Sequence, residues 1–172
     1  MKIKPADQHG FTLIELVLVI SLLGILLAIT TVSLFRPVSK TNLNAISTDV
    51  FSLLREAQNK AINTDTSGDP QSNDWAVHFE SSSYTLFKGT SYSATEPTNF
   101  VVNAPSNITI SPSLPCPSPP GDCNNIVFQR ISGEVLAYDA LNNTVCITQA
   151  SSNKQAFLTI NFVGVVNIQD GC

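Results

Sequence analysis

The sequence has little charge, and this narrows the classes of protein that it can encode. Charged side chains make up 13% of its 172 residues, against about 25% in an ordinary soluble domain. Nine Lys and Arg residues are outnumbered by thirteen Asp and Glu residues, which gives a net charge of −4. Nucleic-acid binding depends on clustered Lys and Arg that displace counterions from phosphates. The charge balance therefore disfavours a nucleic acid as a partner.

Signatures of catalysis and of metal binding are also missing. The sequence contains no GxSxG, P-loop, GxGxxG or HExxH pattern, and its two histidines lie far apart. Glu134 lies in a predicted hairpin and Asp139 lies beside it, which alone is weak evidence for acid–base catalysis. Asp69, Asp74 and Asp170 are candidate calcium ligands, but they form no dense loop of oxygen donors. We expect no enzymatic activity, no cofactor and no metal.

What the sequence does have is a long apolar run near its N-terminus. No charged side chain occurs between Leu16 and Phe35. As a helix with a rise of about 1.5 Å per residue, this run is about as long as the 30 Å hydrocarbon core of a bilayer. We interpret it as a membrane-spanning helix, because a cleaved secretory signal has an apolar region of about 7–15 residues before a small-residue cleavage site. A plain anchor does not explain Glu15, which directly precedes the run.

All four cysteines follow the apolar run, at Cys116, Cys123, Cys146 and Cys172. An even number in a short, loop-rich domain indicates disulfides and an oxidising compartment, which places this part of the chain outside the cytoplasm. Metal ligation is the alternative, but no paired CxxC spacing is present and His78 is remote in sequence. Four cysteines allow three pairings. We favour Cys116 with Cys123, closing a proline-rich loop, and Cys146 with Cys172, tying down the chain end.

Helical periodicity continues beyond the apolar run. Apolar residues recur at steps of three and four, which predicts one apolar stripe on a helix that packs on a sheet. These residues are Leu43, Ile46, Val50, Leu53, Leu54, Ala57 and Ala61. Pro37 predicts a kink or a short break in the helix, since proline removes one helical hydrogen bond and clashes with the preceding turn. The turn-rich stretch 63–74 predicts the end of the helix.

From residue 75 onward the hydrophobic period changes from 3.6 to 2, which predicts strands. We expect 75–80 to form a hairpin with 84–88, and 126–130 to form a second one with 134–138. The other predicted strands are 100–102, 108–110, 144–148, 157–162 and 165–168, and the proline-rich stretch 111–125 is predicted to be a surface loop. The fold class is therefore α+β, with a long N-terminal helix packed on an antiparallel β-rich head.

The string GFTLIE at residues 10–15, together with the apolar run after it, resembles the class III signal of type IV prepilins and type II secretion pseudopilins. The resemblance implies that a prepilin peptidase cuts between Gly10 and Phe11, that the new Phe11 amine is methylated, and that the helix stays attached. It also implies four segments: a leader at 1–10, a transmembrane and filament-core helix at 11–36, an amphipathic helix at 37–63 and a β-rich periplasmic or extracellular head at 64–172.

Glu15 has a specific role under this resemblance. Cleavage would create a positive amine at Phe11, four residues before Glu15. When subunits stack, the carboxylate of one subunit can meet the amine of the next in a medium of low dielectric, where an unpaired charge is costly. Glu15 would then set the register of filament assembly. The alternative is a glutamate that the helix dipole favours near the N-terminus and that faces the lipid headgroups.

Several short strings resemble the H-type minor pseudopilins and the FimT-like minor pilins: LREAQNKAIN (54–63), WAVHFE (75–80), SYTLFKG (83–89) and VFQRISGEV (127–135). The resemblance implies a minor pseudopilin of a type II secretion system or, as the alternative, a minor type IV pilin in pilus assembly, adhesion or DNA uptake. The implied partners are prepilin peptidase, other pilin or pseudopilin subunits and inner-membrane lipid. The implied location is the inner membrane, with the head in the periplasm, and then the filament.

Overall fold

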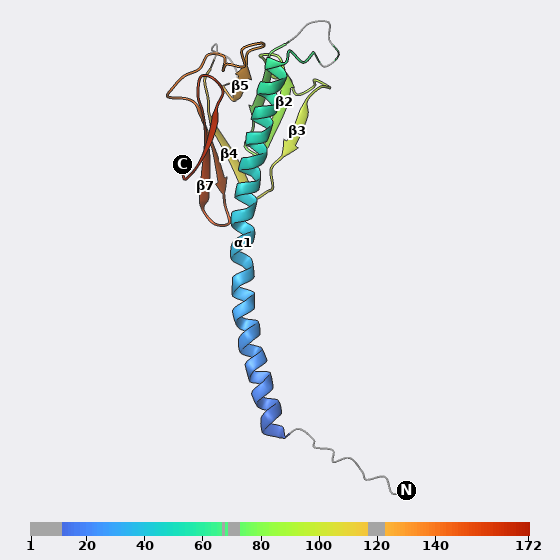
Figure 1. Cartoon of the computed structure of the whole chain (residues 1–172), viewed down its shortest axis with the longest axis vertical. Coiled ribbons are helices and arrows are strands. Elements are labelled where there is room, and N and C mark those ends of the chain that lie inside the picture. Colours follow the sequence, from blue (N-terminus) through green and yellow to red (C-terminus); the bar gives the residue numbers. More distant parts are fainter. Residues whose placement is uncertain (1–11, 67, 69–72, 117–122) are drawn as a thin grey trace, which may run out of the picture. The chain divides into compact units, whose positions relative to one another are not determined.

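The computed structural model describes residues 12–66, 68, 73–116 and 123–172, with the side chains of 26–42 left outside this description. The chain divides into two compact units, residues 1–38 and 39–172. One helix, α1 (Leu13–Ile62), is assigned without interruption (Figure 1). The short break predicted at Pro37 is therefore absent. The fixed φ of proline is close to the helical value, so the backbone can stay helical through Pro37, and the predicted kink stays a prediction.

Within the second unit, α1 packs on the head through the predicted apolar stripe. Its residues are all at most 8% exposed: Leu43, Ile46, Val50, Leu53, Leu54, Ala57 and Ala61. They share one core cluster with residues of both β-sheets, including Phe79 and Leu158. Figure 1 shows this part of α1 against strands of both sheets. The prediction of an amphipathic helix that packs on a sheet is confirmed.

The first sheet contains β1 (Trp75–Phe79), β2 (Ser83–Lys88), β3 (Phe100–Asn103) and β5 (Asn125–Phe128). Its order is β3-β2-β1-β5 and every pair is antiparallel, so the predicted hairpin of β1 and β2 is confirmed. Trp75, Val77 and Phe79 belong to the main core. Ala76 belongs to a small second cluster, against which Tyr92 packs. Both faces of β1 are therefore buried.

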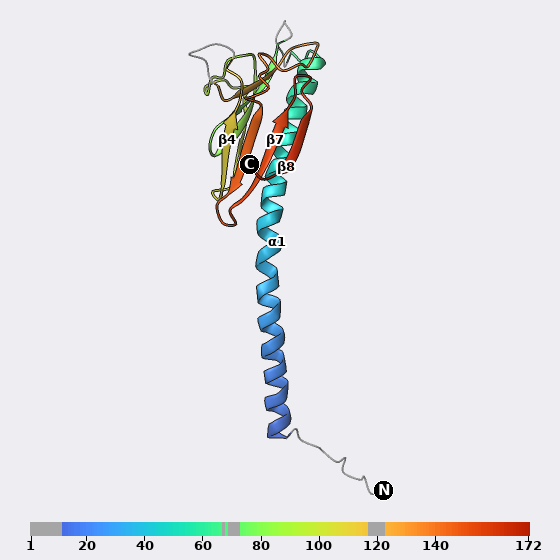
Figure 2. The same cartoon turned by 90° about the vertical axis from the view of Figure 1, so that its left-hand side faces the viewer.

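The second sheet contains β4 (Ile108–Ser113), β6 (Thr144–Gln149), β7 (Lys154–Ile160) and β8 (Val166–Asp170). Its order is β4-β6-β7-β8, again antiparallel throughout, and Figure 2 labels its strands β4, β7 and β8. β4 extends into the stretch predicted to be a loop. Pro112 is tolerated there because β4 is an edge strand, where a missing N–H need not break a ladder bond.

The second predicted hairpin is not formed as a pair of strands. Segment 134–138 makes one isolated bridge, between Phe128 and Val135. The backbone N–H of Leu136 still donates to the Val127 carbonyl over 2.8 Å. Ala137 then has a φ of 54°, a left-handed conformation that turns the chain away from β5 and ends the pairing.

Candidate functional site

The candidate site begins where α1 begins. Thr12 lies directly before the helix, and its Oγ1 accepts a hydrogen bond from the backbone N–H of Glu15 over 3.4 Å. The Thr12 carbonyl accepts from the N–H of Leu16 over 3.2 Å. A Thr followed three residues later by a Glu is the composition of a capping box, which satisfies N–H groups that the first helical turn leaves free. The local sequence therefore starts the helix here.

The Glu15 side chain is exposed in the first turn of α1. A negative charge at this place is favoured by the positive end of the helix dipole. Among the described side chains, Glu15 has no basic partner within ion-pair distance. This position agrees with both hypotheses for Glu15: that it faces the lipid headgroups, and that its carboxylate is available to a neighbouring subunit.

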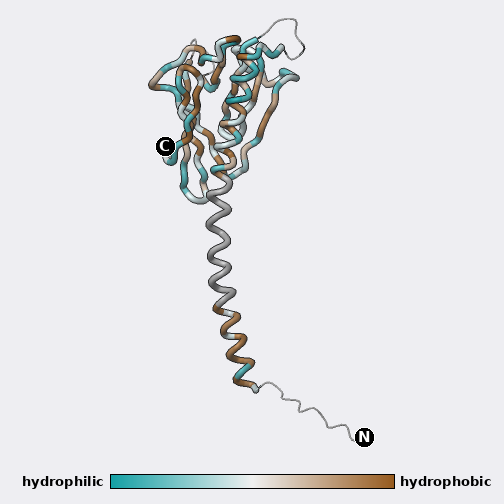
Figure 3. Tube along the Cα trace, viewed as in Figure 1, coloured by the Kyte–Doolittle hydropathy of each residue, from teal (hydrophilic) through white to brown (hydrophobic). Residues whose placement is uncertain are grey.

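An apolar surface surrounds the helix after Glu15. The large apolar side chains are each between 51% and 82% exposed: Leu13, Ile14, Leu16, Val17, Leu18, Val19, Ile20, Leu22, Leu23 and Ile25. The brown colour of this part of α1 in Figure 3 reflects the same run. The hydroxyl of Ser21 donates to the Val17 carbonyl over 2.7 Å, so it adds no unpaired donor to this surface. A helix that is apolar all round requires lipid or protein around it.

Over the part of the chain whose placement is described, no helix combines the length and the apolar character that a membrane crossing requires. The predicted span includes residues 26–36, whose side chains lie outside the description. Gly10 and Phe11, the predicted sites of cleavage and methylation, also lie outside the described residues. The span, the cleavage and the methylation therefore stay predictions.

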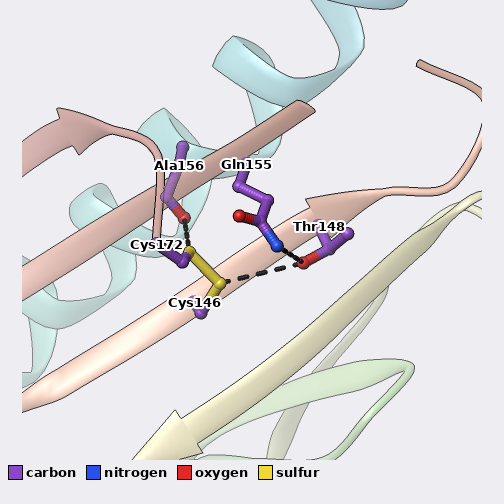
Figure 4. The surroundings of a disulfide bond; sticks show 5 residues. All are labelled: Cys146, Thr148, Gln155, Ala156 and Cys172. Atoms are coloured by element: carbon purple, nitrogen blue, oxygen red, sulfur yellow. Dashed lines mark hydrogen bonds between the residues drawn. A yellow bond between two sulfur atoms is a disulfide. The ribbon is translucent and has the colours of Figure 1, made fainter. Parts of the chain in front are cut away.

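The cysteines form two disulfides, Cys116–Cys123 and Cys146–Cys172, in the pairing favoured from the sequence. The second bond joins β6 to the last residue of the chain, and Figure 4 shows it beside Thr148, Gln155 and Ala156. Both sulfurs of each pair are consumed, so these cysteines are not available as thiolate ligands. Among the described residues, no cluster of His, Cys, Asp and Glu is suited to hold a metal ion.

The other residues considered for chemistry have structural contacts. His78 Nδ1 lies 2.7 Å from Asn125 Oδ1, and its ring stacks on Tyr92 at 3.9 Å between centroids. Asp139 accepts from the backbone N–H of Leu141 over 2.9 Å and from Asn142 over 2.6 Å. These two hydrogen bonds lower the pKa of Asp139, the reverse of what a general acid at neutral pH requires.

The calcium candidates are not brought together. Asp74 Oδ1 accepts a hydrogen bond from the backbone N–H of Arg130 over 2.8 Å, and Asp170 ends β8 on the other sheet. Asp69 lies outside the described residues. The hydrogen bond of Asp74 therefore joins the residue before β1 to the segment that follows β5.

One polar residue that the sequence analysis did not single out connects α1 to two other segments of the head by hydrogen bonds. Gln58 of α1 is 8% exposed, and its Nε2 donates to the carbonyls of Gly133 over 3.0 Å and of Val163 over 2.8 Å. Gly164 has a φ of 79°, and a Cβ there would lie 2.3 Å from Gln58 Nε2. A lone Gln beside the apolar stripe was the available signal, but its partners lie 75 and 105 residues away.

Comparison with known proteins adds one finding. Residues 5–31 match the family model described as the prokaryotic N-terminal methylation motif, a stretch that includes Gly10, Phe11 and Glu15. No curated protein and no solved structure matches the chain. The motif indicates a precursor of the type IV pilin-like and pseudopilin class, whose members are structural subunits. It implies processing by prepilin peptidase and assembly with other subunits of that class.

Proposed function

We propose that this chain is a non-enzymatic subunit of a type IV pilus-like filament, and specifically a minor pseudopilin of a type II secretion system. Prepilin peptidase cuts it between Gly10 and Phe11, and it assembles through its N-terminal helix. The observation that carries this proposal is the coincidence of the methylation motif at 5–31 with a helix surface that is apolar all round. The described apolar surface, from Leu13 to Ile25, lies within the motif.

The apolar surface supports assembly because its side chains are exposed within the N-terminal unit. Moving one exposed Leu or Val side chain out of water is worth about 1.5–3 kcal/mol, so the exposed run from Leu13 to Ile25 favours the inner membrane first. In lipid, helices associate by close packing and by pairing of polar groups. Glu15 then supplies the one carboxylate that a neighbour's methylated Phe11 amine can neutralise.

The two disulfides support a head outside the cytoplasm. Such bonds persist in the periplasm and at cell surfaces, and are rare in the cytosol. Both lie beyond residue 115, in the unit that holds the sheets. This arrangement agrees with a single-pass precursor whose leader faces the cytoplasm and whose head faces the periplasm.

Mass spectrometry of the mature N-terminus tests the proposal most directly. In cells that contain prepilin peptidase, the expected mass is that of a chain beginning at methylated Phe11. In cells without the peptidase, the same chain should begin at Met1. An intact Met1 end in peptidase-containing cells would contradict the proposal.

The register role of Glu15 has its own test. Glu15→Ala should leave processing largely intact and reduce incorporation into filaments, because the neighbour's amine loses its counter-charge. Glu96→Ala, at an exposed residue of the head, is the matched control and should assemble normally. Normal assembly of the Glu15 variant would refute the register role.

The alternative is a minor type IV pilin of the FimT-like group, since the short strings between residues 54 and 135 resemble both groups. Neighbouring genes for a secretin, a secretion ATPase and exoproteins favour secretion, whereas retraction or competence genes favour a pilus. A role in DNA uptake predicts that the purified protein retards double-stranded DNA, with a strong dependence on salt. We expect no retardation, given the net charge of −4.

A further inference from the structure

Helix α1 leaves one part of the first sheet uncovered. A groove with a volume of about 300 Å³ lies between α1 and the strands β2 and β3. Its helical wall carries Asp49, Leu53 and Glu56, and its strand wall carries Tyr84, Phe100 and Val102. All of these residues belong to the unit 39–172. The groove is therefore a feature of the head, separate from the N-terminal apolar helix.

A buried polar group in this groove has no partner within the described chain. Tyr84 is 1% exposed, and its hydroxyl makes no hydrogen bond with any described residue. Burial, and secondly the charge of Asp49, raise the pKa of Tyr84 to about 12. The hydroxyl is therefore neutral at physiological pH and retains its full capacity to donate and to accept. Buried polar groups are normally hydrogen-bonded, so this one calls for a partner.

The strand wall of the groove is the free edge of a sheet. β3 stands at the end of the order β3-β2-β1-β5, and among the described strands only β2 pairs with it. Phe100 is 58% exposed and Val101 is 51% exposed, and successive side chains of a strand point to opposite faces, so apolar side chains are exposed on both faces of this edge. An exposed apolar edge strand is a template for an additional strand.

The register shows where the side chains of an added strand would lie. Tyr84 pairs with Val102, and Leu86 pairs with Phe100, so these four residues point to the same face of the sheet. Successive side chains of a strand alternate between faces. Every second side chain of a strand added beside β3 would therefore lie on the face that carries Tyr84, over the groove.

The helical wall of the groove is acidic. Asp49 and Glu56 are both exposed and stand seven residues apart on α1, a spacing that puts them on one helix face. Neither forms an ion pair with a described side chain. A cationic side chain would be attracted to this wall, and complementary charge at an interface directs partner choice.

We propose that this groove docks an extended segment of another protein that adds to the free edge of β3 and places one Lys or Arg against Asp49, Glu56 and Tyr84. With the basic residue opposite Val102, which pairs with Tyr84, the apolar side chains two residues before and after it lie opposite Phe100 and Ala104. The basic group donates to the carboxylates and to the Tyr84 hydroxyl oxygen. This docking surface lies in the head and does not depend on the filament assignment.

The test uses the full-length protein in neutral maltoside micelles and the capped peptide Thr-Val-Thr-Lys-Thr-Val-Thr, labelled for fluorescence anisotropy. Saturable binding is expected. A peptide with Glu in place of Lys should bind at least about tenfold more weakly, because like charges face each other. Asp49→Lys should reverse this preference and bind the Glu peptide better than the Lys peptide. Absence of saturable binding, or an unchanged preference in Asp49→Lys, would overturn the proposal.

A second variant separates docking from folding. Tyr84→Phe removes a buried hydroxyl that lacks a partner, so the free protein should melt at the same temperature or higher, while peptide affinity falls. Tyr138→Phe, which alters a hydroxyl that accepts from Asn143 over 3.2 Å, should leave affinity unchanged. Unchanged affinity in Tyr84→Phe would contradict the role given to Tyr84. If the protein forms a dimer in the absence of peptide, and Asp49→Lys dissociates that dimer, then the groove binds a second copy of the chain. This result would overturn the peptide proposal.

Discussion

The two ends of α1 are apolar in different ways. From Leu13 to Ile25 the apolar side chains surround the helix, and all of the large ones are at least 51% exposed. From Leu43 to Ala61 the residues of the stripe lie on one face and are at most 8% exposed. The helix is continuous between these stretches. They therefore differ in how the apolar residues are distributed around the helix and not in secondary structure. A stripe finds its partner within the chain, whereas an all-round apolar surface needs a partner outside it.

This difference separates the stability of the head from the proposed assembly. Side chains of the stripe belong to the core cluster with both sheets, so their contacts contribute to the free energy of unfolding. The described side chains of the first stretch have no such partners in the chain. Substitutions should therefore divide into those that unfold the head and those that alter association, according to their position along one helix.

The largest expected effect is from truncation within the stripe. Leu54 is fully buried, and Leu54→Ala should lower the free energy of unfolding of the head by about 2–5 kcal/mol, through lost burial and the cavity left behind. Chemical unfolding followed by tryptophan fluorescence measures this change. The only tryptophan, Trp75, is 3% exposed in the core of the head.

The matched variant lies in the first stretch. Leu18 is 66% exposed, so Leu18→Ala should leave the unfolding midpoint of the head unchanged. A loss of head stability similar to that of Leu54→Ala would show that the two stretches are coupled. The comparison between the ends of α1 would then fail.

The next effect concerns the cross-links, which belong to the head alone. In a chain-entropy estimate, the loop closed by Cys146–Cys172, with a separation of 26 residues, stabilises by about 3.5 kcal/mol. The loop closed by Cys116–Cys123, with a separation of seven, stabilises by about 2.5 kcal/mol. Replacing each pair by serines should therefore lower the unfolding free energy in that order. Equal losses would indicate that native contacts, rather than loop length, determine the effect.

The sequence predicted the parts of the fold that depend on local pattern. The stripe on α1 follows from a period of 3.6, and the hairpin of β1 and β2 from a period of 2. The segment 134–138 has the same alternation, but the left-handed conformation of Ala137 ends its pairing. Pro112 lies within a strand because β4 occupies an edge, and strand order is not visible in one sequence.

Contacts between distant residues were not predictable from pattern. The Gln58 amide reaches carbonyls 75 and 105 residues away, and the Tyr84 hydroxyl lies where α1 and β3 leave a gap. Neither position differs locally from an ordinary helix or strand residue. The motif at 5–31 is the opposite case, because its residues act through a peptidase and neighbouring subunits and carry their signal in the string itself.

A smaller effect is expected from the polar contact beside the stripe. Gln58→Ala should lower the unfolding free energy by about 1–3 kcal/mol, because the carbonyls of Gly133 and Val163 lose their donor. Denaturant unfolding of the full chain measures it. Asn59→Ala, at an exposed neighbouring position, is the control and should change little. A similar loss in both variants would attribute the effect to the helix rather than to the two hydrogen bonds.

The smallest expected effect is a pH dependence of the stability of the head, which arises at Tyr84 in the groove between α1, β2 and β3. Tyr84 has a pKa of about 12 in the folded protein, raised from 10.0 by burial and by Asp49, so folding favours its neutral form. The contribution of this pKa difference to the free energy of unfolding is complete below about pH 10 and is lost as the pH rises toward 12. The reason is that Tyr84 loses its proton at a lower pH in the unfolded chain than in the folded protein. Tyr84→Phe should flatten this alkaline decline, measured by denaturant unfolding from pH 9 to about 12, whereas Tyr138→Phe should keep it. An unchanged decline in the Tyr84 variant would place the alkaline sensitivity elsewhere in the head.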